Sequence, residues 1–169
     1  VSPLEPEKNI ARGREALARI ASSHPGTGLI IVGKGSQKKM LEVRAKELGI
    51  MDRVIFHGWV EETASSFKTA DIFLLMSDFE GYALTLIEAA AAGVSTLTTD
   101  VGLVGDILCD EESVLVCPSR DTACMARKLA RLIEDRILRA RLAKGARRAV
   151  KERVLQSREE YLAAYGRVW

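Results

Sequence analysis

Two glutamates flank a glycine turn near the middle of the chain. Glu80 stands just before the turn, and Glu88 follows it with seven residues between the two. An apolar run precedes the turn and an alanine-rich run follows it, so we expect a buried strand, a turn and then a helix that starts near Tyr82 or Ala83. Free N–H groups and the positive end of the dipole at a helix start favour a phosphate or another anion. The segment therefore predicts an anion site bordered by two carboxylates.

The residues around this turn could contact different parts of a bound ligand. Gly81 and Ala83 are small and leave room for a ligand to approach the backbone. Glu80 would lie at the rim of the pocket, and Glu88 would lie just over one turn into the helix, where its carboxylate could accept two hydrogen bonds from a diol such as ribose. The chain contains three glutamate pairs with this spacing, but only this pair straddles a glycine turn after an apolar strand. The strand, glycine turn and helix around this pair, and not the spacing alone, therefore predict the anion site.

Short apolar runs alternate with segments of helical period along the chain. The runs are rich in β-branched residues and bounded by Gly, Asp or Pro, as is typical of buried parallel strands. We expect strands at 29–32, 54–56, 72–76, 94–98 and 114–116. We expect helices at 36–48 and 83–92, one capped by Asp121, an arginine-rich helix after it, and a last one from Ser157, which forms a capping box with Glu160.

This alternation predicts an α/β fold: a three-layer, Rossmann-like domain with a mostly parallel sheet of five or six strands and right-handed crossovers. The 169 residues and 47% hydrophobic content suit a single domain, residues 1–169. In such sheets ligands bind beyond the carboxyl ends of the strands. The turn after the third strand lies at that edge.

Composition and cysteine content indicate the cellular compartment. No apolar run approaches 18 residues and no charged-then-apolar leader opens the chain, so we expect a cytoplasmic protein. Cys109, Cys117 and Cys124 are odd in number and form no CxxC pair, which predicts reduced thiols and neither a disulfide framework nor a zinc site.

Charge is divided unevenly along the chain. Residues 120–169 hold 14 Lys+Arg against 6 Asp+Glu, whereas residues 1–119 hold 11 against 17. The arginines follow helical spacing with few aromatic residues between them, which favours a solvated helix face over a nucleic-acid surface. We therefore expect no nucleic-acid partner. A peripheral contact with the inner face of a membrane is the alternative use of the basic third.

The order of the motifs resembles that of the retaining glycosyltransferases of family 4, which have the two-domain GT-B architecture. The pair Glu80/Glu88 is similar to the family's E-x7-E motif, and this block is the most specific part of the resemblance. Other segments resemble the family's loops called PEKN, iGdG, drVxFxG and aTdvGG; they are, in that order, residues 5–9, 31–35, 52–58 and 98–102.

The resemblance implies a donor site for a UDP-sugar or a GDP-sugar, with no cofactor or metal required. Lys8 would neutralise the diphosphate leaving group, and Glu80 would contact the transferred sugar. Glu88 would hold the ribose hydroxyls. The phosphates would meet the backbone of Gly81, Tyr82, Ala83, Leu84 and Thr85.

The resemblance assigns two further glycines to the donor site. Gly33 belongs to the turn after the first apolar run, and backbone near Gly58 would meet the nucleotide base. Trp59, beside Gly58, is expected to be a packing residue. The reaction implied is sugar transfer with retention to a glycan or lipid-linked acceptor.

The chain departs from the family pattern at several points. Ala83 stands where the family has glycine, which puts a methyl group where the phosphate approaches, and Leu103 replaces the second glycine of the family's vGG turn. The family's acceptor-binding N-terminal domain, and the strand and arginine that precede the lysine loop, have no counterpart in these residues. We therefore expect a C-terminal GT-B half that is inactive alone, whose final helix, 157–169, docks on the N-terminal domain. The alternatives are a non-catalytic nucleotide-sugar-binding module and another GT-B enzyme such as a sugar-nucleotide epimerase.

Overall fold

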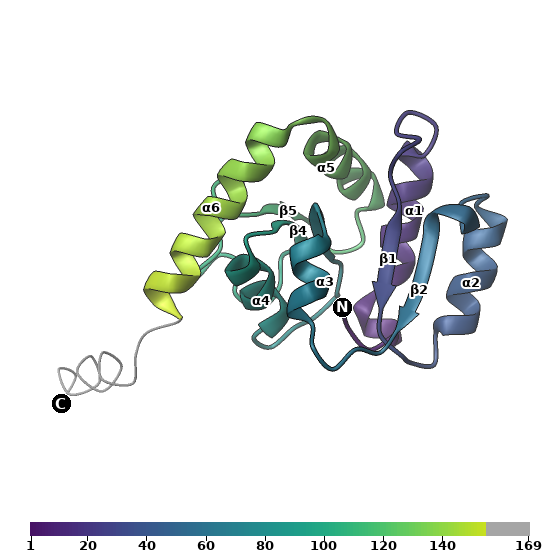
Figure 1. Cartoon of the computed structure of the whole chain (residues 1–169), viewed down its shortest axis with the longest axis horizontal. Helices are drawn as coiled ribbons and strands as arrows, with labels where there is room; N and C mark the ends of the chain where they lie inside the picture. The colour runs from purple at the N-terminus through teal and green to yellow at the C-terminus, as the bar shows by residue number, and fades with distance from the viewer. Residues whose placement is uncertain (155–169) are drawn as a thin grey trace.

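Residues 1–154 are described by a computed structural model, in which parallel strands alternate with helices (Figure 1). All five expected strands are confirmed to within two residues. Their bounds are β1 Leu29–Val32, β2 Val54–Gly58, β3 Ile72–Leu75, β4 Ser95–Thr99 and β5 Leu115–Cys117.

Within residues 1–154, six α-helices and two short 3-10 helices precede, connect or follow the strands. The α-helices are α1 Ile10–Ile20, α2 Lys38–Glu47, α3 Ala64–Thr69, α4 Leu84–Ala92, α5 Thr122–Glu134 and α6 Arg136–Arg153. The 3-10 helices are η1 Pro6–Lys8 and η2 Met51–Arg53.

The expected cap of α5 is confirmed: the carboxylate of Asp121 accepts a hydrogen bond from the N–H of Cys124 at 2.8 Å. Asp135 caps α6 in the same way, by accepting from the N–H of Leu138 at 2.8 Å. Each aspartate satisfies a backbone donor that the first turn of its helix leaves without an intrahelical partner. The expected capping box at Ser157 and the helix over 157–169 lie outside the described residues.

The strands form two sheets, and the expectation of one continuous sheet needs this correction. β1 pairs with β2, and β3, β4 and β5 pair in that order, all in parallel. β1 and β3 are not hydrogen-bonded to each other, because a cavity of about 680 Å3 lies between them.

Two apolar clusters cover the two faces of these strands. One joins α1, α2 and α5 to side chains such as Ile31, Leu97 and Leu115. The other joins α3, α4 and the second half of α6 to side chains such as Phe73 and Leu75. Helices on both faces of parallel strands make the three-layer arrangement that the sequence predicts.

The arginine-rich helix α6 is amphipathic. Its buried residues are Leu138, Leu142, Ala146 and Val150, spaced by four and directed into the domain. Most of the helix's arginines and lysines are exposed on its other side, as the interpretation of a solvated helix face predicts. None of the helices that the structure describes is both long and apolar enough to cross a membrane.

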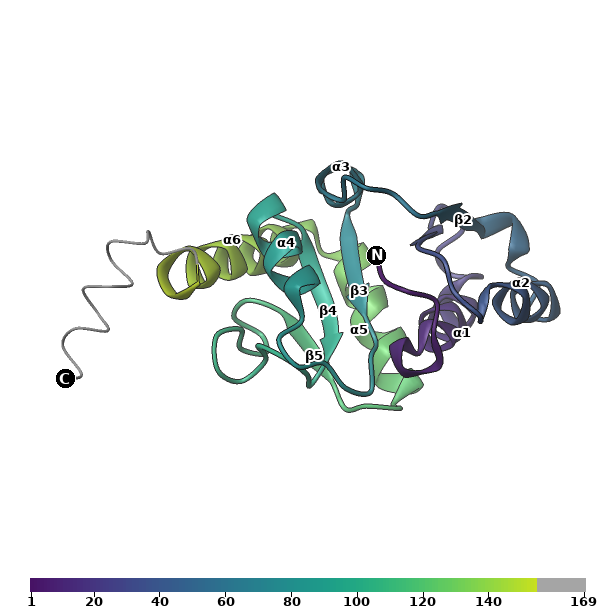
Figure 2. The same ribbon diagram turned by 90° about the horizontal axis from the view of Figure 1, so that it is seen from below.

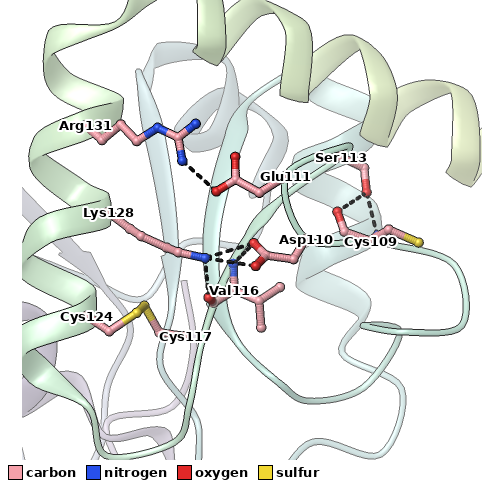
Figure 3. Close-up of polar contacts among 9 residues, drawn as sticks. All are labelled: Cys109, Asp110, Glu111, Ser113, Val116, Cys117, Cys124, Lys128 and Arg131. Atoms are coloured by element: carbon pink, nitrogen blue, oxygen red, sulfur yellow. Dashed lines mark hydrogen bonds and ion pairs between the residues drawn. A yellow bond between two sulfur atoms is a disulfide. The ribbon is translucent and has the colours of Figure 1, made fainter.

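The cysteine prediction is wrong for one pair. Cys117, at the end of β5, is disulfide-bonded to Cys124, in the first turn of α5, with 5.8 Å between their Cα atoms (Figure 3). Cys109 is exposed and free. An odd count and the lack of CxxC gave no sign of the pair, because the turn between β5 and α5 brings together two residues seven positions apart.

Two ion pairs hold the neighbouring loop against α5. Lys128 Nζ contacts the two carboxylate oxygens of Asp110 at 3.0 and 2.9 Å and also donates to the carbonyl of Val116 at 2.7 Å. One turn further along, Arg131 Nη1 donates to Glu111 at 2.5 Å (Figure 3). The loop before β5 is thus joined to the same helix as the disulfide.

Candidate anion-binding site

The first turn of α4 is open to solvent. Ala83 precedes the helix with φ 56° and ψ 62°, and no side chain caps the free N–H groups of the first turn. Gly81, Tyr82 and Leu84 are exposed, and Thr85 is half-buried. The expected helix start is therefore confirmed, and no side chain caps the backbone donors of its first turn. Such a turn can accept an anion.

The loop after β4 supports this turn from behind. A Cβ atom on Gly102 would lie 2.6 Å from the Cβ of Ala83 and 3.2 Å from the carbonyl atoms of Tyr82. Gly102 also has φ +61°, a conformation that favours glycine. The backbones of the two loops therefore touch, and the methyl group of Ala83 fills the space between them.

Lys8 and Glu80 form an ion pair beside this turn. Lys8 Nζ lies 2.8 Å from Glu80 Oε1, and the two side chains are only 20% and 15% exposed. The hydroxyl of Ser77 donates to the same carboxylate oxygen at 2.6 Å. The structure thus brings together two residues that are 72 positions apart and that the sequence assigned to one site.

A buried polar network holds this pair in place. Thr99 Oγ1, at the end of β4, donates to the carbonyl of Ser77 at 2.7 Å, and both residues are fully buried. The N–H of Asp78 donates to the carbonyl of Glu7 at 3.0 Å, which ties η1 to the end of β3. Sequence reasoning assigned no supporting role to Ser77 or Thr99. The available signal was a hydroxyl at the carboxyl end of an otherwise buried strand.

Asp78 extends the network toward the β5–α5 turn. The nearby side-chain amide of Asn9 and then the guanidinium of Arg120 hold the pKa of Asp78 below its usual value, against the effect of burial. Arg120 Nη2 lies 3.3 Å from Asp78 Oδ2. The loops after β3 and β5 are therefore joined by a charge pair next to the candidate site.

Glu88 is exposed on α4, one turn beyond the helix start. Thr63 Oγ1 donates to its carboxylate at 3.4 Å.

The two other predicted glycines lie at the ends of β1 and β2. A Cβ atom on Gly33 would lie 1.9 Å from the carbonyl oxygen of Ser2, so the N-terminal segment occupies the space beside Gly33. Gly58 has φ +88° and open space where a Cβ would be. Trp59 is 58% exposed, so its assignment as a packing residue is wrong. Within residues 1–154, no three His, Cys, Asp or Glu side chains are grouped to hold a metal ion.

Comparison with known proteins shows the family to which the chain belongs. Residues 1–149 match the profile of the family described as Glycosyl transferases group 1. The chain is 32% identical over 149 residues to the glycogen synthase of Mycobacterium tuberculosis, an alignment that covers 87% of this chain and 36% of that protein. The chain thus spans about a third of this curated relative.

Solved structures share the fold. The C-terminal domain of LpcC, a glycosyl transferase group 1 family protein of Francisella tularensis, has a TM-score of 0.82 at 24% identity, covering 89% of this chain and 82% of that one. Anabaena HepE, solved in complex with UDP, has a TM-score of 0.81 at 22% identity, covering 89% of this chain and 42% of HepE. With its profile match over residues 1–149, this chain belongs to the glycosyl transferases group 1 family.

Proposed function

We propose that this chain is the donor-binding, C-terminal half of a retaining GT-B glycosyltransferase of family 4. The observation that carries the proposal is the open first turn of α4, with the Lys8–Glu80 pair on one side and Glu88 one turn further on. The donor would be a UDP-sugar or a GDP-sugar. The full protein would transfer the sugar to a glycan or lipid-linked acceptor held by its N-terminal domain.

The diphosphate would dock on the first turn of α4. The free N–H groups there would donate to the phosphate, and the helix dipole would favour its charge. Lys8 would neutralise the growing charge on the leaving phosphate, since its ammonium is paired with Glu80, the residue directly before Gly81. Fixed amides and a fixed cation stabilise such charge without reorganising during the reaction. Glu80 would then face the transferred sugar.

The nucleoside would extend from this turn past Glu88 toward the end of β2. The exposed carboxylate of Glu88 can accept hydrogen bonds from both ribose hydroxyls. Open space at Gly58 leaves room for the base, and the exposed Trp59 offers a ring on which a base can stack. HepE, which has the same fold, binds UDP, and this supports a uridine nucleotide. Gly33, whose space is occupied by Ser2, would shape the turn without touching the donor.

A titration of the chain with UDP and GDP tests this site. Glu88→Ala should weaken binding of the preferred nucleotide about tenfold or more, because two hydrogen bonds to a charged group are lost. Glu47→Ala, at an exposed position of α2, is the matched control and should bind like the parent. Calorimetry measures both. Absence of binding by the parent at millimolar nucleotide, or an equal loss in the control, would contradict the assignment.

A non-catalytic nucleotide-sugar-binding module is the second candidate. It is favoured by the closed Lys8–Glu80 pair, in which each charge neutralises the other, and by the methyl group of Ala83 at the helix start. Glu80→Gln in the full-length protein separates the two functions. An enzyme would lose sugar transfer and keep donor binding, whereas a module would show no transfer even before the substitution.

We further propose that the exposed basic side of α6 contacts an anionic membrane surface at the cytoplasmic face. Its support is the charge distribution of the helix: four apolar residues are buried against the domain, whereas most of the arginines and lysines, together with Ile137, are exposed. Cosedimentation with anionic and neutral vesicles tests it. Equal binding to both would contradict it.

A further inference from the structure

Two side chains donate to the same oxygen of Glu80. Lys8 Nζ lies 2.8 Å from Oε1, and the hydroxyl of Ser77 donates to that oxygen at 2.6 Å. Within residues 1–154, no other hydrogen bond reaches the carboxylate, and neither of its oxygens is a buried atom without a partner. The second oxygen, Oε2, is therefore in contact with solvent. The protein holds one oxygen of Glu80 and leaves the other available to a ligand.

The two donors differ in how freely they can move. The side chain of Lys8 is long and partly exposed, and it belongs to the short helix η1, so its ammonium can turn toward another anion. Ser77 is fully buried two residues beyond β3, and its hydroxyl is carried on a single rotatable bond. An anion that binds beside the pair can therefore draw Lys8 away from Glu80, but not Ser77.

The backbone of Ser77 is fixed from two sides. Its carbonyl accepts from Thr99 Oγ1 at 2.7 Å, and Thr99 is the last residue of β4, which runs side by side with β3 (Figure 2). The next N–H along the chain, that of Asp78, donates to the carbonyl of Glu7 at 3.0 Å. Side chains supported in this way by rigid strands keep their direction when a neighbouring group moves. The Ser77 hydroxyl therefore stays in place without help from Lys8.

We propose that Ser77 is a positioning residue for sugar recognition: it holds Oε1 of Glu80 when Lys8 turns to the donor diphosphate, and so keeps Oε2 directed at the transferred sugar. This rests on the proposed function, which assigns Lys8 to the diphosphate and Glu80 to the sugar. Without Ser77, a carboxylate released by Lys8 would be free to rotate, and neither oxygen would have a fixed direction. Oε2 held in place can accept a hydrogen bond from a sugar hydroxyl without first losing side-chain freedom.

Calorimetric titration of the 169-residue chain tests this role, with UDP, GDP, UDP-glucose, UDP-N-acetylglucosamine and GDP-mannose as ligands. The quantity compared is the sugar preference, defined as the affinity for a nucleotide sugar divided by the affinity for its nucleotide. Ser77→Ala should lower the sugar preference about fivefold or more, because a fixed side chain becomes mobile, and should change nucleotide affinity less than about twofold. An unchanged sugar preference in this variant would overturn the proposal.

Two outcomes in the parent chain separate this proposal from the proposed function. Absence of UDP and GDP binding would contradict the proposed function and with it the role of Ser77. Binding of a nucleotide, with no nucleotide sugar bound more tightly than its nucleotide, would leave the nucleotide site standing and overturn only the proposal for Ser77.

A double-mutant cycle separates positioning from a general structural role. In a Glu80→Ala background, Ser77→Ala should change the sugar preference less than about twofold, because the carboxylate that Ser77 positions is gone. Equal weakening of nucleotide and nucleotide-sugar binding by Ser77→Ala, in both backgrounds, would overturn the proposal.

Ser95→Ala is the matched control. Ser95 is a buried serine at the start of β4, and within residues 1–154 its hydroxyl has no partner. This variant should bind every ligand like the parent, and a loss of sugar preference equal to that of Ser77→Ala would overturn the proposal.

Urea unfolding checks that Ser77→Ala is folded. Where its cooperative transition is lost, Ser77→Cys takes its place, because a thiol is similar in size to a hydroxyl and donates only weakly. The same selective loss of sugar preference is expected for Ser77→Cys. A folded Ser77→Cys chain with the sugar preference of the parent would overturn the proposal.

Discussion

At the scale of single residues, the start of α4 is determined by two left-handed positions that touch. Ala83 has φ 56° and Gly102 has φ +61°, and the two loops meet with no room for another methyl group. This explains why a glycine is favoured at position 83 in the related motif: an L-residue in this conformation costs about 1–2 kcal/mol. The chain accepts that cost and gains a buried methyl contact.

Gly102→Ala should destabilise the domain by about 2–4 kcal/mol, because backbone strain adds to overpacking against Ala83. Ala83→Gly in the same chain removes the 2.6 Å contact and should recover about 1 kcal/mol or more of the loss. Urea unfolding of the parent, the two single variants and the double variant measures this coupling. Additive effects of the two substitutions would show that the loops do not touch.

Asp78 should make stability depend on acid pH. Its folded pKa is depressed, so its contribution is fully present above the ordinary aspartate pKa and is lost as the pH falls below that value. Asp78→Asn should lower the free energy of unfolding at pH 7 by about 1 kcal/mol, a value discounted for the partial exposure of Asp78. The variant should also show a smaller loss of stability between about pH 5 and about pH 3. Denaturation at a series of pH values, with the exposed Asp71→Asn as control, measures this. An unchanged pH profile would contradict it.

At the scale of elements, the strands and helices follow from local patterns, whereas their lateral contacts do not. The run from Ile72 to Met76 is apolar and β-branched at its start, and it forms β3; Asp121 begins α5 as its capping chemistry predicts. The Lys8–Glu80 pair was placed in one site only through resemblance to a family. The Ser77–Thr99 bond and the Cys117–Cys124 bridge depend on which strand ends are neighbours. The repeating pattern of apolar residues in the sequence does not encode which strand ends are neighbours.

The Cys117–Cys124 bridge should contribute about 2–3 kcal/mol, because it closes a short loop in the unfolded chain. Thiol titration in denaturant should find one reactive thiol, Cys109, before reduction and three after it. Urea unfolding with and without a reductant should show the loss, and Cys124→Ala should make stability insensitive to the reductant. Three reactive thiols in protein purified without a reductant would contradict the bridge.

At the scale of the whole molecule, the candidate site lies where loops after β3 and β4 meet the N-terminal segment. Their network ties Lys8, Glu80 and the end of β3 into one unit. Sequence alternation predicted the layers and this edge of the sheet. It did not predict the split between β1 and β3, because the apolar pattern of a strand does not encode which strand edge lies beside it.

The most direct measurement of the central claim is the change in backbone amide chemical shifts when UDP or GDP is added to isotope-labelled chain. The account predicts the largest changes at residues 81–85, with smaller ones at Lys8 and Glu88, and little change at the exposed face of α2. Changes confined to the cavity between β1 and β3, or no change at millimolar nucleotide, would contradict the assignment of the α4 start as the diphosphate site.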